Sequence, residues 1–400
     1  MSREAVAHTV SATGSRSLLR RMNSLGMLRE LMAQPRSLST LAASSGLSRT
    51  AVDAVIADLV DLGWAEAAQR EEPAGPGRPA TVYRVRARVG HLASIDIGGN
   101  HVYAIVTDLV GNELAHAQGR VDESMPAAAR LAAAFGVLDG ALAEASVSRD
   151  ALWVIAVGSP GAISSDGVVM HFGGDGMPGW IGLDLKSAFA AEYAAAVIVE
   201  GDVPLGAQAE LARGAARGLR DVVYILCGVR TSAATIVDGR VHRGVHGAAG
   251  IVGEMPELRW IDLNEHYGAD VLPSPRPSRE RIFELARAGD PAAVAAATEF
   301  ADYLATGASA MVLALDPELV VIGGGSSPAA DVFLPRFIET LTAICPLPPQ
   351  VTASALGSEA VAIGGLSLAT ALVDATLETA VQAAGEFPDP DATARLLRTA

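Results

Sequence analysis

The chain has 400 residues with a formal net charge of −15, and 50% of its residues are hydrophobic. This composition excludes a disordered chain and leaves room for at least two domains with sizeable cores. Its two cysteines exclude a disulfide framework, and no apolar stretch is found of the roughly 20 residues that span a membrane. With no signal-like segment at the N-terminus, we expect a cytoplasmic protein without membrane contact.

The N-terminal 90 residues differ in charge from the rest. They hold 12 Arg against 8 Asp and Glu, whereas the remainder holds 18 Lys and Arg against 37 Asp and Glu. A basic head on an acidic body favours contact of the head alone with a polyanion such as DNA. A chance difference in surface charge accounts for these counts equally well.

Three helices are predicted in this basic segment. Hydrophobic residues at helical spacing indicate helices over Ser15–Met32, Leu38–Ser44 and Arg49–Leu62. Gly46 permits a tight turn before the third helix, and Ser48 is a good N-cap for it. This order of elements predicts a helix-turn-helix.

Two short strands complete a winged form of the motif. They are predicted over Trp64–Ala67 and Thr81–Val85, with the Pro/Gly-rich loop Glu72–Pro79 as the wing, so residues 15–88 form one predicted domain. The start of the third helix would face the major groove, and the wing would meet phosphate or the minor groove. The candidate DNA-contacting residues are Ser48, Arg49, Thr50 and Asp53 in that helix and Arg78 near the wing tip. A three-helix packing module that binds no DNA is the alternative interpretation.

The remaining chain alternates strands and helices, with glycine and aspartate at the strand ends. Buried strands end at Asp96–Gly99, Ser159–Gly161, Gly201-Asp202, Gly228 and Gly323–Gly325. An α/β protein binds its ligand at such strand ends. A strand, an Asp-x-Gly-Gly turn, a returning strand and a hairpin are typical of the opening of a two-lobed, actin-like ATPase domain.

The order of these motifs resembles the ROK family, which contains sugar kinases and repressors. The resemblance rests on Asp96-Ile-Gly-Gly, Ser159-Pro-Gly, Gly201-Asp202, Gly247-Ala-Ala-Gly250 and Val320-Val-Ile-Gly-Gly-Gly325 in this sequence. It is nearest to the repressor branch, in which a winged helix-turn-helix precedes a sugar-kinase-like body. The resemblance implies an α/β body over residues 91–385 that binds an effector and dimerises.

Two departures from the family pattern bear on ATP. Family kinases carry Thr after the Asp-x-Gly-Gly turn, where this chain has Asn100. Their glycine-rich phosphate loop corresponds to Gly228–Ala234, in which Arg230 and Ser232 replace glycines where backbone must approach phosphate closely. We therefore predict no nucleotide cofactor and no enzymatic activity.

The sugar side departs from the family pattern as well. Asp202 matches the family's catalytic base and is at most a vestige of it, because Gly201 replaces the preceding Asn. Ile251 replaces a sugar-binding Glu, and Glu254 replaces a His that also binds zinc in the family. No Cys follows between Met255 and Pro273, so no metal is predicted. The candidate effector-binding residues are Asn100, Ser159, Asp202 and Glu254.

Three functions are compatible with this pattern. The first is a DNA-binding transcriptional regulator of the repressor type, whose degenerate kinase-like body senses a carbohydrate or a related metabolite. The second is an active, ATP-dependent sugar kinase with an added DNA-binding head. The third is a body that serves only as a dimerisation scaffold. The first predicts double-stranded DNA, a small effector and a second copy of the chain, in a homodimer or homotetramer, as partners.

Overall fold

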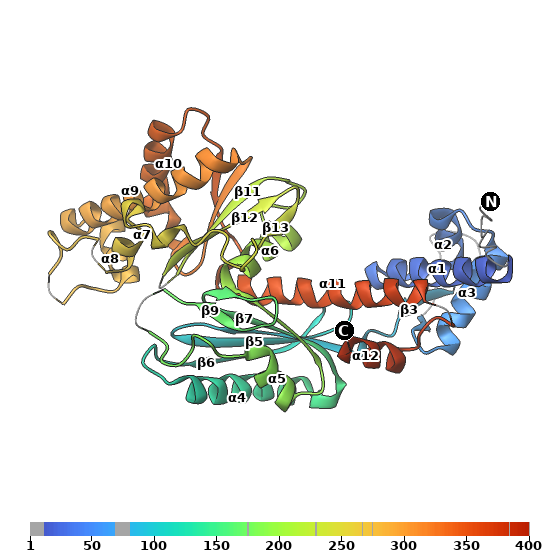
Figure 1. Cartoon of the computed structure of the whole chain (residues 1–400). Coiled ribbons are helices and arrows are strands. Elements are labelled where there is room, and N and C mark those ends of the chain that lie inside the picture. The colour runs from blue at the N-terminus through green and yellow to red at the C-terminus, as the bar shows by residue number, and fades with distance from the viewer. Residues whose placement is uncertain are drawn as a thin grey trace, which may run out of the picture.

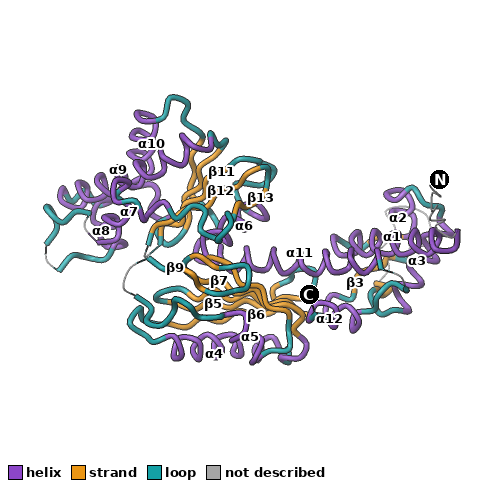
Figure 2. Tube along the Cα trace, in the orientation of Figure 1, coloured by secondary structure: helices purple, strands orange, loops and turns teal. Residues whose placement is uncertain are grey.

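The structure is a computed structural model that describes residues 12–68, 81–173, 176–228, 230–265, 267–273, 275–383 and 385–399. Figure 1 shows a small head at one end of the molecule and two lobes at the other. The long helix α11 (Ala360–Gln382) runs lengthwise from the lobes to the head, as the purple tube of Figure 2 also shows. The predicted α/β class, with a helical head and a two-lobed body, is confirmed.

The head contains the predicted helix-turn-helix. Its helices are α1 (Ala12–Ala33), α2 (Leu38–Ser45) and α3 (Arg49–Asp61). The Ser37 hydroxyl accepts from the Thr40 N–H to start α2, and Gly46 ends it at a φ of 70°. A small sheet in the order β1-β3-β2 packs beside them, from β1 (Arg36–Ser37), β3 (Val82–Val85) and β2 (Ala65–Ala68). The predicted wing loop and Arg78 lie outside the described residues.

The first lobe is built on a five-stranded sheet in the order β10-β7-β4-β5-β6. Helices α4 (Ala127–Ala145) and α5 (Leu185–Glu192) pack with one face of this sheet, and α11 contacts β4 and β7. The hairpin β8 (Ala162–Ile163) and β9 (Val169–His171) extends from the lobe. The sheet strands are β4 (His91–Ile97), β5 (His101–Asp108), β6 (Glu113–Arg120), β7 (Leu152–Ser159) and β10 (Ala196–Gly201).

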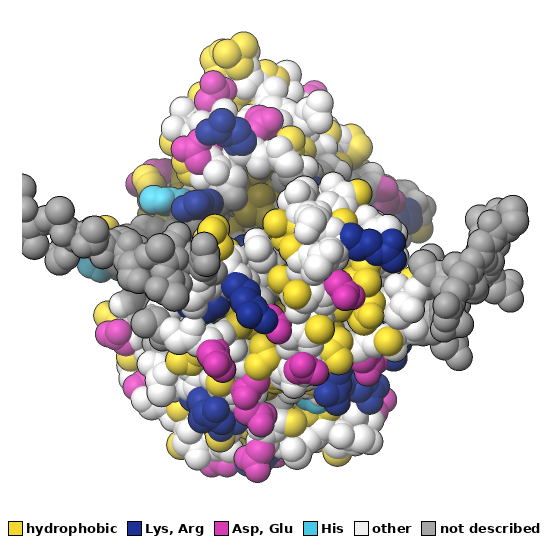
Figure 3. Space-filling model, turned by 90° about the vertical axis from the view of Figure 1, so that its right-hand side faces the viewer, with side chains coloured by type: hydrophobic (Ala, Val, Ile, Leu, Met, Phe, Trp, Pro, Cys, Tyr) yellow, Lys and Arg dark blue, Asp and Glu magenta, His cyan; other side chains and the backbone are white. Residues whose placement is uncertain are grey.

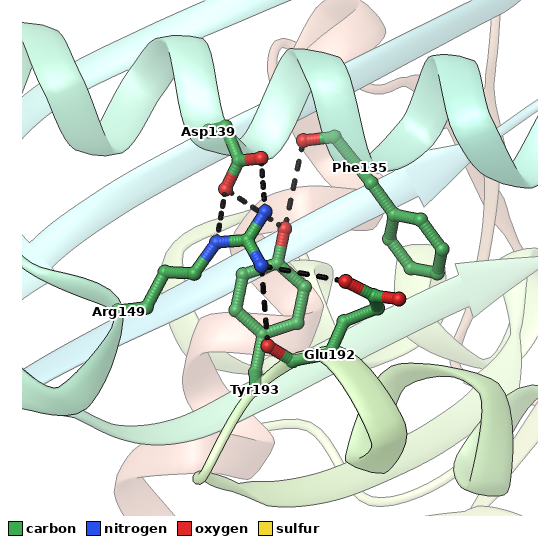
Figure 4. A network of polar contacts seen from close by, with 5 residues as sticks. All are labelled: Phe135, Asp139, Arg149, Glu192 and Tyr193. Carbon is green, nitrogen blue, oxygen red and sulfur yellow. Dashed lines mark hydrogen bonds and ion pairs between the residues drawn. The ribbon is translucent and has the colours of Figure 1, made fainter.

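A polar network holds the outer helices of the first lobe together (Figure 4). The Arg149 guanidinium binds the Asp139 carboxylate on α4 and the carbonyl of Glu192 at the end of α5. It also lies over the Tyr193 ring, 4.7 Å from the ring centroid. The Tyr193 hydroxyl donates to Asp139 at 3.1 Å and to the carbonyl of Phe135 at 3.5 Å. These contacts join the end of α5 to α4, so we assign the network a role in stabilising the fold of the first lobe.

The second lobe repeats the plan with a sheet in the order β13-β12-β11-β14-β15. Helix α6 (Asp202–Arg213) packs on one face and α9 (Pro291–Leu315) on the other. The strands are β11 (Val222–Cys227), β12 (Thr231–Val237), β13 (Arg240–His242), β14 (Leu319–Gly323) and β15 (Gln350–Ala353). The other helices of this lobe are α7 (Trp260–Glu265), α8 (Arg279–Arg287) and α10 (Ala330–Ile344).

Short 3-10 helices connect elements in both lobes. Among the described residues they lie at 87–89, 149–151, 252–254, 256–258, 327–329 and 357–359.

Helix α11 tests the expectation that no segment reaches the length of a membrane span. The helical segment Gly357–Gln382 is long and apolar enough by length and composition, so that expectation is wrong for this segment. Half of the most apolar 18 residues of this segment are buried inside the protein. Because α11 packs against α6, β4, β7 and α1, its apolar residues are accounted for by the core.

The core does not break between head and body. One cluster joins Leu28 of α1 and Trp64 of the head to Leu92 and Trp153 of the first lobe. It continues through α11 to the last described helix, α12 (Pro390–Arg398), which contributes the buried Leu397. The division of the chain into domains over 15–88 and 91–385 stays a prediction.

Candidate functional site

The exposed face of α3 is the first candidate site. The Ser48 hydroxyl accepts from the Ala51 N–H and caps the helix. Val52, Val55, Ile56 and Leu59 are buried, which turns the opposite face of the helix outward. Arg49, Thr50 and Asp53 all lie exposed on that outer face. Neither Arg49 nor Asp53 has an ion-pair partner within the parts of the chain that the structure describes, so both charges are available to a ligand.

Most other arginines that the structure describes in the head are paired with a carboxylate. Arg20 binds Asp58 through two hydrogen bonds of 2.8 and 2.7 Å, and Arg84 lies 2.7 Å from Glu66. Figure 3 looks onto the head end, where dark blue and magenta side chains are interspersed with yellow ones. The positive charge of the described part of the head is therefore partly neutralised, whereas Arg49 is exposed and unpaired there and could reach a base edge.

The second candidate site is a cleft of about 370 Å³ between the lobes. Its first wall is the end of the β8–β9 hairpin with Phe172, and its second wall comes from β12 and the segment 247–254. Asp202 and Glu254, both predicted as effector ligands, line this cleft, as does Ile251. Ser159 and Asn100 are not among its lining residues. The Ser159 hydroxyl instead accepts from the indole N–H of Trp180 at 2.9 Å.

Asp202 starts α6 at the floor of the cleft. Its carboxylate accepts from the Val203 N–H at 2.8 Å. Burial, and after it the nearby charge of Asp96, raise the pKa of Asp202 to about 7. A carboxyl group with this pKa can donate as well as accept a hydrogen bond near neutral pH.

His101 closes the Asp-x-Gly-Gly turn. Its Nε2 lies 3.0 Å from the buried carboxylate of Asp96, which raises the pKa of the imidazole. A Cβ on Gly98 would lie 2.6 Å from the His101 ring, so the ring lies directly against the turn. The buried Arg130 also donates to the carbonyls of Gly98 and Gly99. The protein's own side chains thus bind both the backbone of this turn and its Asp96 carboxylate.

Two contacts cross the cleft from lobe to lobe. The guanidinium of Arg230 lies over the Phe172 ring, 4.4 Å from its centroid. The Nε2 of His171 lies 3.2 Å from the Glu254 carboxylate. Sequence reasoning missed His171 and Phe172 and treated Arg230 only as a lost glycine. No periodic pattern in the sequence indicates these contacts, because they depend on how the two lobes pack together.

The cysteine and histidine side chains that the structure describes do not form a metal-binding cluster. Cys227 and Cys345 are buried and unbonded to each other. Within the described ranges, no three His, Cys, Asp or Glu side chains are placed to hold a metal ion. His266 lies outside these ranges.

Known proteins match most of the chain in sequence. The model of the ROK family matches residues 92–259 and 274–372. The xylose repressor of Bacillus subtilis (strain 168) is 22% identical over 326 residues, covering 76% of this chain and 83% of its own. The xylose repressor of Caldicellulosiruptor bescii is 21% identical over 371 residues, covering 82% and 89%.

Solved structures divide by how much of the chain they cover. A ROK family transcriptional regulator, described as a homologue of the E. coli MLC protein, superposes with a TM-score of 0.68 at 18% identity. It covers 96% of this chain and 100% of its own. A ROK glucokinase from Streptomyces griseus gives a TM-score of 0.58 at 23% identity and covers 70% of this chain and 99% of its own. The regulator therefore shares the fold over a longer part of this chain than the glucokinase does.

Proposed function

The chain belongs to the ROK family, and on that premise we propose that it is a DNA-binding transcriptional repressor with an effector-sensing body. One observation carries the proposal. A capped, outward-facing α3 on the head is joined to a body in which His101 and Arg130 bind the Asp-x-Gly-Gly turn. The names of the curated relatives, xylose repressors of two bacteria, support the same function.

The head supplies the DNA contact. Arg49 at the start of α3 would read a base edge in the major groove, with Thr50 and Asp53 beside it. The Ser48 hydroxyl is engaged in the helix cap, so its contribution would be to hold α3 in position. Arg78 on the wing remains part of the proposal as a phosphate or minor-groove contact.

The cleft supplies the effector site. Asp202, Glu254 and His171 offer hydrogen bonds to hydroxyl groups, while Ile251 and Phe172 offer apolar contact. We infer a carbohydrate or related metabolite with fewer hydroxyl partners than glucose. Ser159 and Asn100 would act through the neighbouring turns. The regulator would work in the cytoplasm as a homodimer or homotetramer on a roughly palindromic duplex.

A sugar kinase is the second candidate function. Asp202 lies in the cleft as a kinase base would, and a glucokinase of Halalkalibacterium halodurans is 27% identical over 265 residues. Against it, the Asp96 carboxylate is bound by His101 and the phosphate loop contains Arg230. Both features weigh against ATP binding.

In vitro selection of duplexes from a random pool tests the proposal. The full chain should enrich one palindromic motif, and Arg49→Ala should relax base preference at one position in each half-site. Arg217→Ala, which removes an exposed arginine of the body, is the matched control and should select the same motif. Failure of the unmodified chain to enrich any motif, together with ATP-dependent phosphorylation of a sugar, would support the kinase instead.

A further inference from the structure

A second, mostly apolar pocket lies where the head meets the body. It has a volume of about 430 Å³, within the range of small-ligand sites and far larger than one water molecule requires. Helix α1 of the head supplies Leu25 and Leu28, and the body supplies Leu92, Leu366 and Leu377. All five side chains are buried, which makes the walls of the pocket apolar.

One buried hydroxyl lines the pocket without a partner. Thr107 on β5 is 1% exposed, and its Oγ1 has no hydrogen-bond partner among the residues the structure describes. A buried polar group left without a partner costs free energy, so native proteins rarely retain one. A ligand atom that pairs with Thr107 would remove that cost.

The charges that line the pocket leave one positive group uncompensated. Arg29 binds Asp374 through two hydrogen bonds and reaches Glu378 as well. Arg213, at the end of α6, has no ion-pair partner within the described parts of the chain. Its Nη2 would lie 3.4 Å from a Cβ on Gly111, which places the guanidinium beside the β5–β6 turn. A carboxylate matches the fork geometry of such an arginine, and it is the anion that also suits an otherwise apolar pocket.

From these three observations we propose that this pocket binds a small organic acid with an apolar body. The apolar part would lie between α1 and α11, and the carboxylate would meet Arg213 with one oxygen and pair with Thr107 through the other. Because one wall belongs to the head and the others to the body, the bound acid stabilises the head in this orientation. This pocket is separate from the cleft that holds Asp202.

Calorimetric titration of the full chain with octanoate and with 1-octanol tests the proposal. Octanoate should bind saturably at one site per chain and raise the melting temperature. Arg213→Gln should weaken octanoate binding by about tenfold to a hundredfold and leave 1-octanol unchanged, because only the acid uses the charge. Arg217→Gln, the same change on an exposed arginine nearby, is the control and should bind octanoate normally.

Two further variants locate the site. Thr107→Val should weaken octanoate binding, and Ala371→Trp should abolish it, because position 371 is an exposed position in the lining of the pocket. Absence of saturable octanoate binding, or full binding by Ala371→Trp, would overturn the proposal. Because no DNA is present, these outcomes do not depend on the proposed repressor function.

Discussion

At the scale of single residues, the environment of Asp202 differs from that of an ordinary exposed carboxylate. Burial and the nearby Asp96 charge both favour its neutral form, which places its pKa at about 7. His101 is paired with Asp96, because its Nε2 lies 3.0 Å from that carboxylate. Asp202 is therefore a group at the cleft whose charge changes near neutral pH.

Asp202→Asn should therefore change the dependence of stability on pH. In the unfolded chain Asp202 ionises near pH 4, whereas in the folded chain it keeps its proton up to about pH 7. Below pH 4 the group is protonated in both states, so its burial does not penalise the folded state. As the pH rises from 4 to 7 the unfolded chain gains the ionised form first, and the folded state loses stability relative to it. Above pH 7 the variant should be more stable than the unmodified chain by on the order of 1–3 kcal/mol, and at pH 4 the two should be alike.

Urea unfolding at pH 4, 6 and 8 measures this difference. Asp166→Asn, on an exposed loop of the first lobe, is the control and should follow the unmodified chain at each pH. A difference between Asp202→Asn and the unmodified chain that does not grow from pH 4 to pH 8 would contradict the environment described for Asp202.

At the scale of elements, the crossing of α6 and α11 connects the two lobes. A Cβ on Gly364 of α11 would lie 1.9 Å from the carbonyl oxygen of Leu205 on α6. A Cβ on the neighbouring Gly365 would lie 2.1 Å from the side-chain hydroxyl oxygen of Ser94 on β4. Glycine at both positions lets α11 approach the helix and the sheet at once.

Gly364→Ala should destabilise the protein by about 2–3 kcal/mol or more, because backbone atoms must move to admit the methyl group. The control is Gly26→Ala in α1, where an added Cβ would meet nothing within 4 Å. That change should stabilise the protein by about 0.5–1 kcal/mol through the helix preference of alanine. Equal effects of the two variants in urea unfolding would show that the crossing is looser than described.

The elements were more predictable from the sequence than the contacts between them. The helix over Arg49–Leu62 was predicted within one residue, because its hydrophobic spacing and the Ser48 cap mark it locally. Asp202 and Glu254 were predicted near the ligand from motif order, and both line the cleft. His171 pairs with Glu254 across 83 residues of chain, so nothing local could reveal it. Helix α11 was not predicted at all.

At the scale of the whole molecule, the head is built into the body. The Trp64 indole N–H donates to the carbonyl of Pro388 at 2.7 Å, and its ring meets Trp153 edge to face. The guanidinium of Arg21 donates to the carbonyls of Val381 and Gly385 near the end of α11. These contacts tie the orientation of the head to α11, which also packs on both lobes.

Trp64→Ala should therefore destabilise the first lobe as well as the head. The loss should be about 3–5 kcal/mol, as for other buried aromatic side chains. In hydrogen exchange, amides of β4 and β7 should lose protection, whereas those of β11 and β14 should not. Trp260→Ala, which opens a cavity in the second lobe, should show the reverse pattern. Unchanged protection of β4 in the Trp64 variant would mean that the head folds separately.

Genome-wide mapping of the DNA bound by this chain, in the cell that makes it, tests the central claim most directly. The repressor account predicts a limited set of bound sites that share one roughly palindromic motif and lie at the starts of genes. Arg49→Ala should lose these sites or spread to others, while Arg217→Ala keeps them. Binding at no discrete site, or identical sites for the unmodified chain and Arg49→Ala, would contradict the account.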